Sequence, residues 1–326
     1  MASKGSSLKS YVAKRLLLIP IVILVVIFVN FTIINFASGN PIHMLCGEFT
    51  PSPEFVEQLT KEYGLNESYY VRLFKYSVKV FQGDLGYSFY YGQSVSSLIA
   101  ERMPTTFLLM IPPLIFSAIL GMVLGIVSAT SKKSVVDNLI STFAAVGYSL
   151  PVFFVALILM EVFSILFPIF PAGGLGLVKG VGLQYIVQIL RYLILPWATL
   201  ITINVAFIIR LTRSKVSDLK VADFVTTAKA KGLSEFHVIY KHILPNSLSP
   251  IITVIGMNFG LSFMGAIVTE TIFGIPGMGQ LLSDAIHARD VPIIMGIFVV
   301  VAIIVALANL TADIVCAHLD PRIRCK

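Results

Sequence analysis

Three carboxylic acids interrupt long apolar stretches of this sequence, at Glu161, Glu270 and Asp313. A carboxylate at membrane depth is the kind of group that ion-coupled carriers use to bind or relay a cation or a proton. For Glu270 and Asp313 the simpler interpretation is a contact with a neighbouring helix or with the membrane interface. Glu161 lies deepest in its stretch, so we select it for lining a path, together with the amides Asn204 and Asn258.

The other chemistry-bearing residues do not form a catalytic or metal-binding pattern. The sequence has no GxSxG nucleophile turn, no HExxH zinc motif and no GxxxxGK[ST] phosphate loop. Its five histidines are scattered, and its three cysteines show no CxxC or Cys/His spacing. We expect a chain that is not an enzyme and binds no metal or cofactor, so an ATP-driven process would need ATP and Mg held by other subunits. An intramembrane protease is the weaker alternative.

The composition places the chain in a lipid bilayer. Of its 326 residues 56% are hydrophobic and 13% are charged, and the mean hydropathy is +0.88. A soluble domain carries about a quarter of charged residues, and a membrane span needs about 20 mostly apolar residues. The sequence therefore predicts an all-α polytopic membrane protein with six transmembrane helices. The expected spans are 16–36, 106–130, 139–167, 185–211, 251–273 and 291–316.

The lysines and arginines set the expected orientation. The net charge is +7, but most of the 24 basic residues fall in alternate connecting segments, which argues against nucleic-acid binding. By the positive-inside bias those segments and both termini are cytoplasmic, in a plasma or inner membrane. The expected divisions are a cytoplasmic N-terminus with the first span (1–36), an extracellular cap (37–103), a transmembrane core (104–317) with a cytoplasmic loop at 212–249, and a cytoplasmic tail (318–326).

Small and cyclic residues within the spans predict how the helices pack and bend. Gly121 and Gly125 form a GxxxG pair, which we interpret as close helix packing. Prolines at 112–113, 151 and 196 each remove an amide donor and are expected to bend their helices.

The cytoplasmic loop has an architecture that topology alone does not require. Apolar side chains recur at helical spacing after Asp223, the expected N-cap, and Gly232 is the expected left-handed residue that ends this helix. A second short helix is expected to start at Ser234 and to stop at Pro245. Two amphipathic helices joined by a tight corner predict a rigid protrusion.

This loop resembles the EAA loop of importer-type ABC permeases, whose pattern is EAA, three residues, Gly, nine residues, Ile, one residue and Leu-Pro. With Thr226 at the acidic position and His242 at the isoleucine position, TTAKAKGLSEFHVIYKHILPNSLSPIIT is similar to the variant of dipeptide and oligopeptide permeases. Segments 81–106, 269–292 and 309–324 also resemble the B-type subunit of that family. The other positions of the loop pattern are occupied by Thr227, Ala228, Gly232, Leu244 and Pro245.

The resemblance implies that the corner is a coupling helix that docks on a cytoplasmic ATPase. Ala228 and Gly232 are small enough for a partner backbone to approach, and Phe224 and Val225 are the expected apolar contacts. A rigid corner transmits a displacement of the ATPase, whereas a floppy linker absorbs it. The residues expected to couple to the ATPase are Asp223, Phe224, Thr226, Thr227, Ala228, Gly232, Leu233 and Glu235.

On the outer side, the glycine-rich segment 269–292 is expected to dip toward the membrane before a short helix at 281–289. We interpret it as part of an extracellular gate or receptor-docking rim, with a purely structural re-entrant turn as the alternative. By resemblance the cap is also a docking surface for an extracellular substrate-binding protein. The residues expected at the gate or rim are Asp84, Glu270, Gly274, Pro276, Gly277, Gly279, Asp284, Arg289 and Asp290.

The sequence as a whole is identified as a member of the ABC importer permeases, with the type I permease fold. The resemblance implies half of a heterodimeric pore that imports di- or oligopeptides, with a second homologous permease, two ABC ATPases and a substrate-binding protein as partners. Oligosaccharides and nickel chelates are the alternative cargoes. An ion-coupled secondary carrier working alone is the alternative of a different class.

Overall fold

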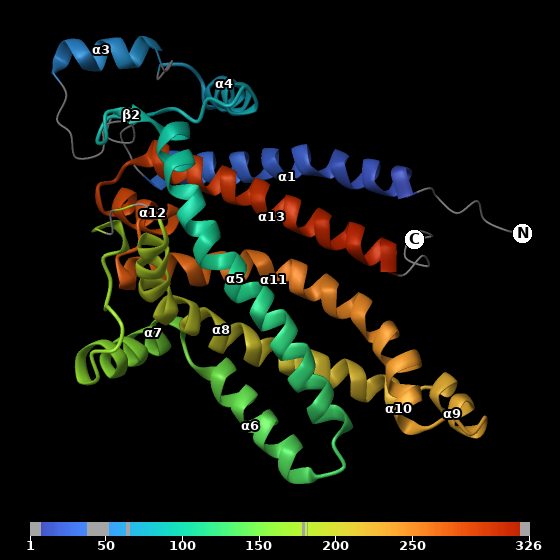
Figure 1. Ribbon diagram of the computed structural model, residues 1–326. Coiled ribbons are helices and arrows are strands. Elements are labelled where there is room, and N and C mark those ends of the chain that lie inside the picture. The colour runs from blue at the N-terminus through green and yellow to red at the C-terminus, as the bar shows by residue number, and fades with distance from the viewer. Residues whose placement is uncertain (1–7, 38–51, 63–65, 178–179, 181, 320–326) are drawn as a thin grey trace, which may run out of the picture. The chain divides into compact units, whose positions relative to one another are not determined.

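The computed structural model describes residues 8–37, 52–62, 66–177, 180 and 182–319, most of them helical (Figure 1). The first elements are α1 (Leu8–Ala37), α3 (Pro53–Glu62), α4 (Tyr69–Phe81), β1 (Tyr87–Ser88), β2 (Gln93–Ser94), α5 (Val95–Thr130), α6 (Ser134–Ser149), α7 (Val152–Met160) and the π-helical turn η1 (Glu161–Leu166). They are followed by the 3-10 turn η2 (Leu175–Leu177), α8 (Leu183–Lys220), α9 (Asp223–Ala230), α10 (Glu235–Val238), the π-helical turn η3 (Ile239–Ile243), α11 (Leu244–Phe273), α12 (Met278–His287) and α13 (Val291–Leu319).

The long helices coincide with the expected spans. Among the described residues, four segments are long and apolar enough to cross a membrane singly, and two further helix pairs meet the same test only when taken together. The described chain therefore has four to six spans, which confirms the all-α, multi-pass organisation. The single segments are Arg15–Ile34, Val95–Thr130, Leu183–Lys220 and Val291–Ala317, and the bent pairs are Ser134–Ser149 with Val152–Leu166 and Glu235–Gly260 with Ser262–Phe273.

The third expected span is wrong as a continuous helix, because α6 and α7 meet at an angle of 100°. Pro151 is the N-cap of α7, and Leu150 before it is extended, with φ −82° and ψ 132°. A proline disfavours the helical conformation for the residue that precedes it. Steric exclusion at Leu150 therefore ends α6 instead of bending it.

Pro245 also acts differently from the sequence expectation. The chain runs from α10 through η3 directly into α11, and Pro245 lies in the first turn of α11. A proline in a first turn has no amide that would need an intrahelical partner, so it starts a helix as readily as it stops one. The expected end of the second short helix at Pro245 is therefore wrong.

The chain divides into two compact units. The larger is built on Leu108–Ile275, with the chain from Ala308 onward, and the smaller on Ala13–Phe107 and Pro276–Leu307. The expected division into N-terminal span, cap, core and tail remains a prediction. Of the expected cap, 38–51 and 63–65 lie outside the described residues, as does the tail beyond residue 319.

Helix α8 is the centre of the larger unit, where it packs against α6, α7 and α11. The GxxxG pair on α5 lies against the same helix: a Cβ at Gly121 would lie 2.7 Å from the Cβ of Ile208, and one at Gly125 would lie 2.6 Å from the Cβ of Thr212. Real side chains do not approach that closely, so both positions need glycine. The expected close helix packing is confirmed.

In the smaller unit, the C-terminal end of α1 packs against α4. The Tyr69 hydroxyl lies 2.6 Å from the Thr32 hydroxyl, and the rings of Phe31 and Tyr76 stack with centroids 5.8 Å apart. The short antiparallel pair β1–β2 leads into α5. At the other end of the unit the buried Thr106 hydroxyl accepts a hydrogen bond of 2.8 Å from the amide of Met278, the first residue of α12.

Candidate functional site

The corner predicted in the loop 212–249 is formed by α9 and α10. Gly232 has φ +80°, the left-handed conformation expected at this position. The Ser234 hydroxyl caps α10 by accepting a hydrogen bond of 3.4 Å from the amide of His237, as expected. Asp223 is instead the first residue of α9, whose N-cap is Ala222, so its expected capping role is wrong. Its carboxylate still lies in the first turn, where a negative charge favours a helix.

The inner face of the corner is packed against its own chain. Val225 and Ala228 of α9 are 1% and 5% exposed, and they join a buried apolar cluster with Val216 of α8, Val238 of α10 and Ile243 of η3. The expected apolar contact of Val225 with a partner is therefore wrong, whereas the close approach of a partner backbone at Ala228 remains a prediction. These side chains fix α9 in place, since burying apolar surface is what stabilises such a contact.

Other side chains of the corner are left exposed. Three aromatic side chains are exposed: Phe224 on α9 by 38%, Phe236 on α10 by 69% and Tyr240 on η3 by 58%. The ring centroids of Phe236 and Tyr240 lie 4.4 Å apart. Thr226 and Thr227 are also exposed, and Leu233 is half-buried against the inner cluster. We call Phe224, Thr227, Phe236 and Tyr240 the exposed set. Exposed aromatic side chains of this kind are typical of protein contacts.

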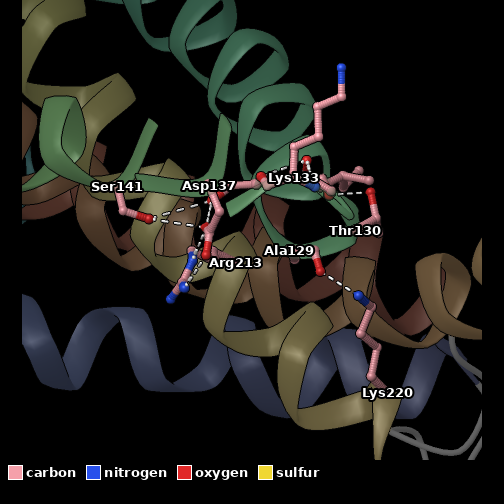
Figure 2. A network of polar contacts seen from close by, with 10 residues as sticks. Ala129, Thr130, Lys133, Asp137, Ser141, Arg213 and Lys220 are labelled. Carbon is pink, nitrogen blue, oxygen red and sulfur yellow. Dashed lines mark hydrogen bonds and ion pairs between the residues drawn. The ribbon is translucent and has the colours of Figure 1, made fainter. Parts of the chain in front are cut away.

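Two polar contacts hold the corner and the end of α8 that precedes it to α5 and to the turn after α5. The Lys220 ammonium, at the end of α8, donates to the carbonyl of Ala129 on α5 (Figure 2). The Lys132 ammonium lies 3.1 Å from the carboxylate of Glu235, the first residue of α10. Glu235 is one of the residues expected to couple to the ATPase, and in the structure it forms an ion pair within its own chain.

A second polar cluster lies where α5, α6 and α8 meet. The Arg213 guanidinium donates to both carboxylate oxygens of Asp137, at 2.7 and 2.8 Å, and Ser128 and Ser141 donate to the same carboxylate (Figure 2). Sequence reasoning missed this cluster, because Arg213 was counted only as a cytoplasmic charge. An available signal was the i, i+4 spacing of Asp137 and Ser141 at the start of a helix.

The residues expected at the outer gate divide between the units. Glu270 and Gly274 belong to the larger unit and the other seven belong to the smaller one. Glu270 is fully buried near the end of α11, and its carbonyl accepts a 2.9 Å hydrogen bond from the amide of Ile275. Gly274 ends α11 in the left-handed conformation, with φ +58°. Gly277 and Gly279 are buried around the start of α12, and Pro276 is half-buried.

Asp290, one of the residues expected at the gate, has a buried and hydrogen-bonded side chain. It is 2% exposed and accepts hydrogen bonds from the Ser88 hydroxyl and, at 3.2 Å, from the amide of Ile293 in the first turn of α13. Burial raises the pKa of the Asp290 carboxyl above its ordinary value of 3.8. The charges of Asp284, Arg289 and Asp290 suggest pairs that would fix this short helix, but among the described residues Arg289 and Asp284 form no ion pair, so that expectation is wrong. Asp84 is exposed and accepts from the amide of Gly86 at 2.9 Å.

Two of the three residues expected along a path lie on one cavity. Asn204 of α8 and Asn258 of α11 line a cavity of about 180 Å³ within the larger unit, with Ser262, Tyr148 and Phe207 among its other walls. The hydroxyl of Ser262 lies 3.1 Å from the carbonyl of Asn258 and 3.3 Å from the side-chain oxygen of Asn204, and both oxygens are acceptors for its hydrogen.

The third, Glu161, does not reach this cavity. It is an exposed residue at the start of η1 and is not among the residues that line the space.

The fold defines a class of membrane transport protein. The structure matches an inward-facing form of the MetNI methionine ABC transporter with a TM-score of 0.50 and 13% sequence identity, over 68% of this chain and 96% of that one. This likeness shows the fold of a type I ABC importer permease.

Comparison with known families gives the particular family. The chain belongs to the inner membrane components of binding-protein-dependent transport systems, whose model matches residues 121–324, and the model of their N-terminal region matches residues 8–110. It is therefore a permease subunit of an ABC importer, and the resemblance found in the sequence is confirmed.

Curated relatives cover nearly the whole chain. The dipeptide transport system permease protein DppB of Alkalihalophilus pseudofirmus is 37% identical over 97% of this chain and 99% of its own. The oligopeptide transport system permease protein AppB of Bacillus subtilis is 35% identical over 96% and 99%. The di/tripeptide permease DppB of Pseudomonas aeruginosa is 34% identical over 97% and 98%.

Proposed function

We propose that this permease imports short peptides that an extracellular binding protein delivers. The cargo is supported by the relatives named above, whose names specify dipeptides, di- and tripeptides or oligopeptides. Oligosaccharides and nickel chelates are the competing cargoes for the same machinery. An ion-coupled carrier that works alone is the competing mechanism.

The working assembly holds four membrane-associated subunits and a receptor. This chain pairs with a second homologous permease, and two ABC ATPases bind ATP and Mg on the cytoplasmic side, because this sequence has no phosphate loop of its own. The distribution of lysine and arginine supports a cytoplasmic position for the corner and for both termini. The gate segment and the cap then face the binding protein.

The observation that carries this mechanism is the two-sided corner. Its inner face is buried in its own chain through Val225 and Ala228, while Phe224, Phe236 and Tyr240 remain exposed. An ATPase that grips the exposed set can move the permease, since the buried face transmits the displacement to α5 and α8. Coupling requires that the ATPase dimer hold this corner differently in its ATP-bound and ATP-free states.

Transport by the reconstituted complex tests the proposal. Vesicles holding both permeases, the ATPases and the binding protein should accumulate labelled trialanine when ATP is supplied to the ATPases. Phe236→Glu should abolish that uptake while leaving the amount of permease in the membrane unchanged, because a charge enters the expected contact. Val135→Glu, the same kind of change at a similarly exposed side chain at the start of α6, is the control. Uptake driven by an ion gradient without ATPases, or uptake of glycans or nickel chelates in place of peptides, contradicts the proposal.

A further inference from the structure

The cavity between α8 and α11 has the donors and acceptors of a peptide-binding site. Its polar groups are the side-chain amides of Asn204 and Asn258 and the hydroxyl of Ser262, while Tyr148 and Phe207 supply aromatic walls. An asparagine amide presents both N–H donors and a carbonyl acceptor, which are the complement of a peptide bond. A volume of about 180 Å³ is about six times the ~30 Å³ that one water molecule occupies in the liquid.

The two amides differ in how far the protein satisfies them. Asn204 is 8% exposed, donates to the carbonyl of Leu200 at 2.9 Å and accepts from Ser262 at 3.3 Å. Asn258 is less buried, and its amide nitrogen reaches the Asn204 oxygen only at 3.5 Å, the far limit of a hydrogen bond. Asn204 is therefore held in position, and Asn258 gains a stronger hydrogen bond if a ligand enters.

A cation lies beside this cavity. The guanidinium of Arg210, an exposed residue of α8, lies 4.7 Å from the ring centroid of Tyr148, which is a wall of the cavity. No carboxylate of the described chain forms an ion pair with Arg210, whereas Arg213 one turn further along α8 is held bidentately by Asp137. A cation–π contact stabilises the guanidinium without neutralising it. Its planar donors remain suited to a carboxylate.

We propose that this cavity is a subsite on the import path for the C-terminal residue of a peptide. Arg210 binds the terminal carboxylate, Asn258 and Ser262 bind the last peptide group, and Tyr148 and Phe207 contact the side chain. This proposal rests on the proposed peptide function. It adds the place in the permease where the peptide is held and the end of the peptide that is recognised. Its affinity must be low, because a ligand in transit has to leave again.

The test uses the complete reconstituted complex with two probes, trialanine and trialanine C-terminal amide. Arg210→Gln should reduce ATP-driven uptake of the free acid about tenfold, mainly through KM, because a charge-assisted contact is lost. Uptake of the amide, relative to wild type, should change less than about twofold. Arg210→Lys keeps the charge and should restore part of the uptake of the acid. The matched control is Arg191→Gln, an exposed arginine on the same helix that donates to the carbonyl of Ile169 and should transport both probes normally.

ATPase activity stimulated by the binding protein, measured in the same vesicles, reports assembly of each variant. An unchanged KM for trialanine in Arg210→Gln overturns the subsite, and so does an equal loss for the acid and the amide with ATPase stimulation intact. If Arg210→Gln also loses the ATPase stimulation by the binding protein, the KM for trialanine is measured in Asn258→Leu instead. An unaltered KM in Asn258→Leu overturns the subsite. Wild-type vesicles that take up neither probe with ATP refute the peptide function itself, which separates the two failures.

Discussion

At the scale of the residue, the buried carboxyl of Asp290 makes the stability of the folded protein depend on pH. The group is held by Ser88 and by the first turn of α13, and burial raises its pKa from 3.8. The folded protein therefore binds this proton more tightly than the unfolded chain does. The protonated Asp290 carboxyl therefore adds to the free energy of unfolding. This contribution is fully present below pH 3.8 and is lost as the pH rises through the raised pKa of the folded state.

We expect Asp290→Asn to remove this dependence. Asparagine keeps an acceptor for the Ile293 amide but carries no charge. The stability of the variant relative to wild type should therefore increase as the pH rises from 3.8 through the raised pKa of Asp290. Each unit by which the pKa is raised corresponds to about 1.4 kcal/mol. Thermal unfolding of both proteins in detergent, measured at several pH values, gives the difference. A constant difference at all pH values contradicts the argument.

The pair of Asp137 and Arg213 should contribute more than a surface ion pair. The ion pair is bidentate and two serines donate to its carboxylate, so we expect a coupling energy of about 1 kcal/mol in a double-mutant cycle. The partial exposure of both side chains keeps this energy from being larger. Exposed Glu57 and Lys61 on α3 provide the control cycle, for which about 0.3 kcal/mol is expected. Unfolding of the alanine variants in detergent gives both values. Equal coupling in the two cycles would show that the geometry adds nothing.

At the scale of the element, adjacent residues of α9 have opposite roles. Ala228 is 5% exposed inside the apolar cluster, so Ala228→Leu should overpack it and lower the free energy of unfolding by about 1–3 kcal/mol. Thr227 is exposed, so Thr227→Leu should change stability by less than about 0.5 kcal/mol. Unfolding in detergent measures both. If the two variants are equally stable, Ala228 does not anchor α9.

Local chemistry made several features of the elements predictable. The left-handed Gly232, the Ser234 cap and the GxxxG contact each depend on one residue type in one conformation or one close approach. The helix break at Pro151 and the helix start at Pro245 were not predictable in the same way. A proline fits both sides of a helix boundary, and neighbouring packing decides which one forms.

The candidate site was predictable in position but not in orientation. The pattern around α9 identified the corner, yet Val225 and Phe224 are both apolar and adjacent, and only the packing on α5 and α8 buries one and exposes the other. Likewise Asn204 and Asn258 are 54 residues apart, and the contact of α8 with α11 brings them to one cavity. Tertiary contacts of this kind leave no local signal in a single sequence.

At the scale of the whole molecule, the two bent helix pairs decide the topology. If both pairs cross the bilayer, the chain has six spans and the corner at α9 lies on the same side as the N-terminus. If both turn back as re-entrant loops, four spans remain and the same corner lies on the opposite side. The termini share one side in either case, so their position does not discriminate, whereas that of α9 does. The positive-inside bias favours six spans, because the corner is basic.

Labelling of single cysteines should decide between these topologies. In a variant whose three native cysteines are serine, Lys231→Cys at the end of α9 should react with a membrane-impermeant maleimide only after the cytoplasmic face is opened. Glu57→Cys on α3 should react in intact cells, and both should react in detergent, since both side chains are exposed. A corner labelled from outside would show that α6 and α7 turn back without crossing, which rules out six spans. It would also separate α9 from any cytoplasmic ATPase, which removes the basis of ATP-driven import.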